Sequence, residues 1–172
     1  MGRPTALARI ARSMGMSQAV WRRHANPWSV WTRFTCLPLL VLAIWSRDLL
    51  GWAALIPVVL SLLWIWANPR VFPEPASLDS WGARAVLGER IHIYRPDDVA
   101  PHHILALKWL TWAPLIGVIP LIWGVWTLDP FATITGVVLT ALPKMWFCDR
   151  MVWIAQDWQA AGHHWAELDD TG

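Results

Sequence analysis

Four stretches of the chain are almost free of charged residues, and their lengths indicate the fold class. Residues 49–66 and 109–128 contain no charged side chain over 18 and 20 positions. At about 1.5 Å per residue, helices of that length cross the hydrocarbon core of a bilayer. Residues 28–46 and 130–147 are equally apolar apart from Arg33 and Lys144, whose long side chains can reach back to the interface. The pattern predicts four transmembrane helices over these four ranges.

The tryptophans support this interpretation, because eleven of the sixteen lie at or near the ends of the apolar stretches. Indole prefers the depth at which hydrocarbon meets the lipid headgroups. The flanking residues are Trp28, Trp31, Trp45, Trp52, Trp64, Trp66, Trp109, Trp112, Trp123, Trp126 and Trp146. Such a distribution favours an all-α integral membrane protein, with the four helices in two hairpins, over a soluble helical bundle.

The distribution of charge predicts the orientation. Seven arginines precede the first acidic residue, Asp48, whereas the rest of the chain holds seven basic and twelve acidic residues. Since short cytoplasmic segments retain lysine and arginine, we expect the N-terminus in the cytoplasm and the protein in the bacterial cytoplasmic (inner) membrane. Four crossings then place the C-terminus and the connection 67–108 on the same side. Cys36 and Cys148 would face a reducing compartment, where a structural disulfide is not expected.

The segments outside the apolar stretches are predicted to be interfacial helices on the cytoplasmic side. Residues 1–20 form a basic leader that is predicted to be a surface helix. Met14 and Met16 within it are alternative translation starts. Residues 21–172 form a single membrane domain. A stripe of large apolar residues predicts an amphipathic C-terminal helix over 145–165 that lies along the membrane. The stripe consists of Phe147, Met151, Ile154, Trp158 and Trp165.

Local signals predict where helices begin and where they pack. Asn is a preferred N-cap and Pro is favoured at the first helical position, so a helix should begin at Asn26 and Pro27. Asp79 or Ser80 could cap a short helix that carries Trp81. Small residues spaced four apart should let the third and fourth membrane helices approach closely. They are Ala113 and Gly117 on one helix, and Ala132, Gly136 and Thr140 on the other.

The string WRRHANPWSVWTRF is the densest polar and aromatic motif in the chain. We interpret it as the cytoplasmic start of the first membrane helix. The motif and interface residues are Asn26, Pro27, Trp28, Trp31 and Arg33. This structural interpretation leaves His24 without a role.

The sequence identifies no catalytic residue, because it holds no Gly-rich phosphate loop, nucleophile elbow or HExxH helix. All six histidines fall on the predicted cytoplasmic side, together with Glu89, Asp149 and Asp157. Histidine is the commonest transition-metal ligand and carboxylates can complete such sites. The candidate metal ligands are therefore His24, His92, His102, His103, His163 and His164.

A simpler explanation of the histidines is that the outer connections are too short to hold them. We therefore predict no cofactor, with a metal site or a haem held by His24 or His92 as the alternative. The HxxxH and HxxHH boxes of the membrane desaturases and hydroxylases do not occur. Similarity to that superfamily is confined to topology and assigns no residue a role.

Four strings carry a closer resemblance: WRRHANPWSVWTR, NPRVFP, VLGER and WFCDRMVW. They resemble a family of small prokaryotic integral membrane proteins of unknown function, marked by H-x-N-P-x-S-x-x-T-R, here His24 to Arg33. The resemblance covers about Trp21 to Trp165 and leaves the leader before Gln18 outside. It implies a multi-pass membrane protein and brings no activity, cofactor or catalytic residue.

Taken together, these features predict a non-catalytic accessory, assembly or lipid-interacting and partner-interacting protein of the inner membrane. The expected partners are the lipid bilayer and other membrane proteins, and no nucleic acid. The alternative is a metal-dependent or haem-dependent membrane oxidoreductase that uses the cytoplasmic histidines.

Overall fold

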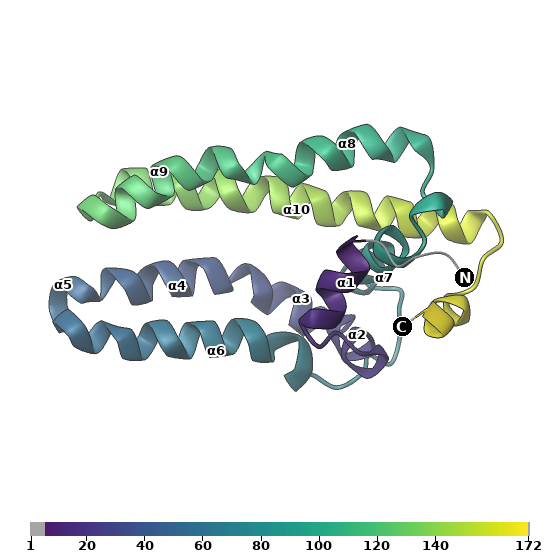
Figure 1. Cartoon of the computed structure of the whole chain (residues 1–172), viewed down its shortest axis with the longest axis horizontal. Helices are drawn as coiled ribbons and strands as arrows, with labels where there is room; N and C mark the ends of the chain where they lie inside the picture. Colours follow the sequence, from purple (N-terminus) through teal and green to yellow (C-terminus); the bar gives the residue numbers. More distant parts are fainter. Residues whose placement is uncertain (1–5, 172) are drawn as a thin grey trace.

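The computed structural model describes residues 6–171, and every regular element within them is a helix. Figure 1 shows an elongated molecule in which two pairs of long helices lie along the long axis. Short helices gather at one end of these pairs. We refer to residues 36–66 and 113–142 as the stem, and to the other described residues as the head. The first and last described elements, which are helices, both belong to the head.

The first half of the stem turns back on itself, so that α4 and α6 lie side by side (Figure 1). After α3 (Pro27–Phe34) in the head, the elements are α4 (Cys36–Trp45), α5 (Arg47–Leu50), η1 (Gly51–Ala54) and α6 (Leu55–Val71), which ends in the head. The predicted helix 49–66 is therefore misplaced at both ends. The chain turns at Gly51, whose φ of 53° suits glycine, and only then enters α6. At the other end, α6 continues past Pro69 because α3 holds that end through side-chain hydrogen bonds.

The second half of the stem belongs to two helical rods that continue into the head. One rod contains α8 (Pro101–Trp112) and α9 (Pro114–Thr127), and the other is α10 (Pro130–Ala160). Asp129 caps α10 by accepting hydrogen bonds from the amides of Phe131 and Ala132. The predicted helix 109–128 thus begins eight residues earlier, at Pro101, inside the segment expected to connect the spans.

The helix predicted over 145–165 is helical to Ala160, but it is the continuation of α10 and not a separate element. α10 runs through Pro143 without interruption, ends at Ala160, and is followed by Gly162 with a φ of 92° and by η3 (Trp165–Thr171). The apolar stripe on this part of α10 is protein core, because α7 (Trp81–Tyr94) covers it. It therefore does not face the membrane as predicted.

Glycines bring α9 and α10 into backbone contact. A Cβ on Gly117, Gly124 or Gly136 would overlap the backbone of Thr140, Thr133 or Leu121 on the facing helix. The prediction that Gly117, Gly136 and Thr140 allow close approach is confirmed, and Gly124 with Thr133 extends the contact. Helices this close gain dispersion energy along their whole length, which is the main source of helix association in lipid.

The head packs around α7, which lies between α10 and the N-terminal helices α1 (Ala6–Ser13) and α2 (Gln18–His24). Ser80 caps α7 by accepting from the amide of Ala83, as one of the two predicted caps would. Gly88 sits where α7 crosses α10, and a Cβ there would overlap the carbonyl of Met151. This contact explains the glycine of the VLGER string, because any larger residue would push α7 off α10.

The part of the predicted leader that the structure describes contains the helix α1, and its contact with lipid stays a prediction. Within it, α1 buries Ala8 and Ala11 in a cluster that includes Trp21 and Val86. Its small residues therefore face the protein, while Leu7 and Ile10 remain exposed. The first five residues of the predicted leader lie outside the described residues.

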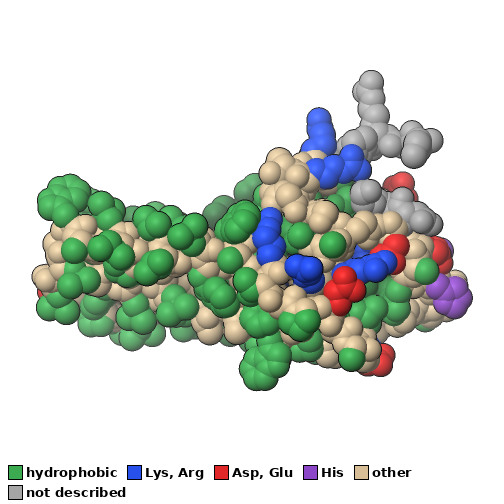
Figure 2. Space-filling model, turned by 90° about the horizontal axis from the view of Figure 1, so that it is seen from below, with side chains coloured by type: hydrophobic (Ala, Val, Ile, Leu, Met, Phe, Trp, Pro, Cys, Tyr) green, Lys and Arg blue, Asp and Glu red, His purple; other side chains and the backbone are tan. Residues whose placement is uncertain are grey.

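The surfaces of stem and head differ sharply in chemistry. Three helical stretches are long and apolar enough to cross a membrane, Pro27–Val71, Pro101–Thr127 and Pro130–Ala160, and the first of them contains the turn between α4 and α6. Figure 2 shows hydrophobic side chains over the stem and most charged side chains over the head. Along the stem the only Asp, Glu, Lys or Arg residues are Arg47, Asp48 and Asp129, all in the turns farthest from the head.

Arg47 connects the two halves of the stem at this far end. Its Nη2 donates to the carbonyl of Trp126 at 2.8 Å and to that of Val125, both in the last turn of α9. Carbonyls at the end of a helix have no partner within the helix, so a guanidinium is well suited to them. Between α4 and α9 an apolar cavity of about 600 Å³ separates the halves, and Arg47 lines it.

Candidate functional site

The opening motif folds into a network of polar contacts between α3 and the end of α6. Asn26 caps α3 as predicted, since its Oδ1 accepts from the amide of Trp28 at 2.9 Å. Its Nδ2 also donates to the carbonyl of Pro73 at 3.0 Å, so the same side chain holds the segment that follows α6. A cap that also binds a segment distant in the sequence stabilises both local and tertiary structure.

Asn68 is the centre of this network. It is fully buried, its Oδ1 accepts from Ser29 Oγ at 3.2 Å, and its Nδ2 donates to Thr32 Oγ1 at 2.7 Å. Buried amides are costly unless both ends are paired, and here both are. The strings WRRHANPWSVWTR and NPRVFP therefore contact one another, and Ser29 and Thr32 of the motif have structural roles.

His24, which the capping interpretation left without a role, lies in the same region. It is buried against Trp21, with the ring centroids 5.6 Å apart, and its Nδ1 lies 2.7 Å from Arg33 Nη2. A guanidinium can only donate, so Nδ1 accepts and the proton of the neutral ring is on Nε2. Burial, and then the positive charges of Arg33, Lys144 and Arg70, hold the pKa of His24 well below its usual value of 6.5. His24 is therefore a neutral acceptor that positions Arg33.

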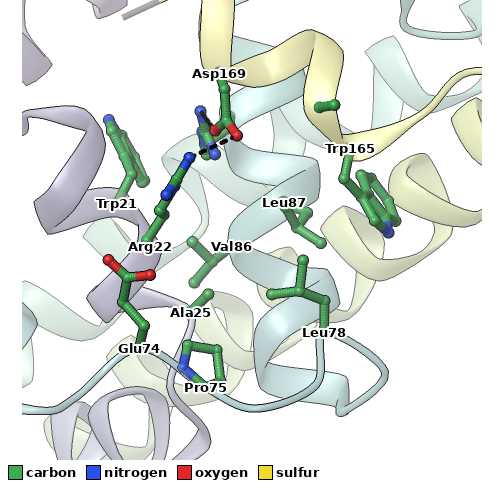
Figure 3. A pocket seen from close by; sticks show the side chains of 12 residues that line it. Trp21, Arg22, Ala25, Glu74, Pro75, Leu78, Val86, Leu87, Trp165 and Asp169 are labelled. Carbon is green, nitrogen blue, oxygen red and sulfur yellow. Dashed lines mark hydrogen bonds and ion pairs between the residues drawn. The ribbon is translucent and has the colours of Figure 1, made fainter.

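A cavity of about 320 Å³ lies in the head between α2, α7 and η3. Figure 3 shows Trp21 and Trp165 on opposite sides of it, with Arg22 and Asp169 in contact. Arg22 and Arg90 both pair with Asp169, at 2.9 and 3.5 Å, and Arg90 also donates to the carbonyl of Leu168 at 2.7 Å. These charges tie the C-terminal segment to α2 and α7, which gives them a structural role.

Two of the six histidines meet at a common carboxylate. His102 and His103 lie in the first turn of α8, and Asp157 lies in the last turn of α10. The Nε2 atoms of His102 and His103 are 3.3 and 2.9 Å from Asp157 Oδ2. This is the one group of three or more His, Cys, Asp or Glu residues, among those described, whose ligand atoms lie close enough to share a metal ion.

The other candidate ligands have separate surroundings. His163 Nδ1 lies 3.1 Å from Glu167 Oε2 and its ring stacks on Trp158, while the amide of His164 donates to Glu167. His92 lines a cavity of about 340 Å³ beside Lys108, and its burial lowers its pKa. The structure thus joins His102 and His103, and leaves His24, His92, His163 and His164 out of the described group.

Comparison with known proteins gives a single match. The sequence profile of a Family of unknown function (DUF6653) matches residues 5–171. The chain belongs to this family. No curated protein and no solved structure matches it.

The DUF6653 match extends further than the resemblance drawn from the four strings. It includes residues 5–17, which that resemblance left out, and so takes in α1 and its contact with the head. Membership of DUF6653 supplies no activity or ligand. The chemistry of the protein must therefore be argued from its own residues.

The neutral state of His24 predicts a pH-dependent stability. The unfolded chain takes up a proton at this histidine near pH 6.5, whereas the folded protein does so only at much lower pH. The unfolded state then binds more protons, so stability should fall as pH drops below about 6.5, by about 1 kcal/mol per pH unit. Thermal unfolding in detergent between about pH 7.5 and 5.5 measures this loss.

His24→Gln keeps a side-chain acceptor for Arg33 but cannot be protonated, so its acid-induced loss should be smaller than that of the wild type. His164→Gln, at an exposed position, serves as the control and should behave as the wild type. Equal losses in all three proteins would show that His24 is not the titrating group.

Proposed function

We propose that this member of DUF6653 is a multi-pass inner-membrane protein that crosses the bilayer four times and keeps both termini in the cytoplasm. On this proposal it is a non-catalytic accessory or assembly protein whose head, held against anionic lipid, binds protein partners. The observation that carries the proposal is the boundary between stem and head. There a charge-free apolar surface gives way, over a short distance, to cations associated with aromatic rings.

Three cation and ring pairs mark this boundary. Arg70 lies 4.4 Å from the ring centroid of Trp66, Lys144 lies 4.6 Å from that of Phe147, and Arg150 lies 4.3 Å from that of Trp153. Rings prefer the interfacial depth and cations prefer the anionic cytoplasmic leaflet, so together they suit one side of a bilayer.

The opposite end of the stem has rings but few charges. Trp52 and Trp126 are 90% and 80% exposed, and Arg47 is the single cation of that end. The distribution of positive charge therefore favours the head on the cytoplasmic side. Because α4 and α6 lie antiparallel, as do α9 and α10, the three apolar stretches supply four crossings on this proposal.

The proposed absence of catalysis is supported by how the polar groups of the head are used. Asn68, Arg90 and His24 all have protein partners that join one helix to another. The alternative, a metal-dependent or haem-dependent oxidoreductase, draws support from one observation, the group formed by His102, His103 and Asp157. That observation concerns a metal ion and gives no support to haem.

Reporter fusions test the proposed topology. Green fluorescent protein fused after Pro75 or Gly172 should fluoresce in the cytoplasm, and alkaline phosphatase fused at Asp48 or Asp129 should be active outside. The positive head and the two short far turns require this pattern. An active phosphatase after Gly172 would contradict it.

The proposed contact with anionic lipid predicts a charge-dependent stability. The double variant Lys108→Gln/Lys144→Gln should lose part of the stability that the wild type gains when phosphatidylglycerol replaces phosphatidylcholine in proteoliposomes, about 1 kcal/mol per cation. Lys108→Arg/Lys144→Arg keeps the charges and should retain the gain, which added salt should weaken. Unfolding measured in both lipids tests this. A wild type that is equally stable in both lipids would contradict a head held by anionic lipid.

A further inference from the structure

The group formed by His102, His103 and Asp157 lies in the head, away from the network around Asn68. Both histidines belong to the first turn of α8, which Pro101 begins, and Asp157 is one turn from the end of α10. The site therefore joins the two rods of the second half of the stem at their head end. Neither the proposed topology nor the contact with lipid makes use of these side chains.

The spacing of the three side chains matches that of ligands around one small ion. In a tetrahedral site with ligands at about 2.0–2.1 Å from the metal, neighbouring ligand atoms are about 3.3 Å apart. The Nε2 atoms of His102 and His103 lie 3.3 and 2.9 Å from Asp157 Oδ2, and all three ligand atoms lie within 4.8 Å of one another. Small rotations of the side chains would place an ion between them.

A purely structural hydrogen bond does not account for His102. His103 is 1% exposed, and its bond to Asp157 alone is enough to join α8 to α10. The side chain of His102 is 63% exposed, yet it points to the same carboxylate oxygen, with its ring centroid 4.1 Å from that of His103. An exposed side chain is free to turn toward water. Because His102 stays beside His103 and Asp157, two imidazole nitrogens and one carboxylate oxygen lie within reach of a single ion.

We infer that His102, His103 and Asp157 form a binding site for a divalent transition-metal ion of the zinc class. Two imidazole nitrogens and one carboxylate oxygen are ligands that zinc accepts, whereas magnesium and calcium prefer oxygen alone. The three groups carry one negative charge with both rings neutral, which a divalent ion offsets. Since the side chains of His102 and Asp157 are 63% and 49% exposed, the fourth position is open to water or to a ligand.

The site is tested by titrating metal-free protein with zinc. The full chain is purified in detergent with an affinity tag that contains no histidine, treated with a chelator, and titrated with ZnCl₂ by calorimetry. A parallel titration with CoCl₂ follows the visible absorption of tetrahedral cobalt. The variants are His102→Gln and Asp157→Asn, with His164→Gln as the matched control at an exposed histidine outside the group.

We expect one zinc ion per chain in the wild type and in His164→Gln, and affinity at least tenfold weaker in His102→Gln and Asp157→Asn. His102 is exposed, so its substitution should leave the unfolding temperature unchanged. X-ray absorption of zinc bound to the wild type should show two imidazole ligands and does not depend on any variant.

Zinc uptake that is equal in the wild type and His102→Gln would mean adventitious binding and overturn the inference. The same conclusion would follow if the wild type bound no zinc, or if its absorption spectrum lacked two imidazoles. None of these results would bear on the topology or the lipid dependence, whose assays involve neither His102 nor Asp157.

Discussion

The middle of the stem exposes apolar side chains on its outside, and this surface constrains everything else in the molecule. In water each Å² of such a surface costs about 25 cal/mol, and the proposed bilayer is an apolar solvent that removes this cost for long helices covered with Leu, Ile and Trp. In that solvent no backbone group can remain unpaired, which leaves helices as the possible structure for these segments. Charged residues must then collect at the two ends, as they do at Arg47 and Asp48 and in the head.

The same constraint determines how the helices are held together. Apolar side chains gain little by leaving lipid for protein, so association depends on close backbone contact and on polar groups at the ends. Gly124 and Gly136 provide the first between α9 and α10. Arg47 provides the second at the far end, and Asn68 provides it near the head. Between α4 and α9 a cavity remains, and Arg47 lines it at the far end.

The features that the sequence predicted correctly are those that depend on near neighbours. Asn26 and Ser80 cap their helices through contacts with residues two or three positions away. The small residues of α9 and α10 mark a packing face because of their helical spacing. The lengths of the apolar stretches predicted an all-helical chain, although helix ends shifted at the turn around Gly51 and where the head packs against them.

The features that the sequence did not predict depend on residues far apart in the chain. The ranges 130–147 and 145–165 were predicted as two helices, but α7 packs against α10 beyond Pro143 and the helix is continuous. Asn68 contacts Ser29 and Thr32 across 39 and 36 positions of the chain. Local sequence patterns do not report contacts over such a separation. His103 and Asp157 are 54 positions apart, so their convergence follows from the packing of α8 on α10.

The most direct test of this account is to measure whether lipid or water surrounds the middle of the stem. Spin labels attached singly at Val59, Ile119 and Ile134, which are 51%, 75% and 64% exposed, can be measured in lipid nanodiscs. The account predicts that oxygen, which concentrates in lipid, relaxes these labels more strongly than a water-soluble nickel complex, and that a label at Gln159 in the head shows the reverse. Strong relaxation by the nickel complex at Ile119 would mean that water surrounds the stem, and would contradict the account.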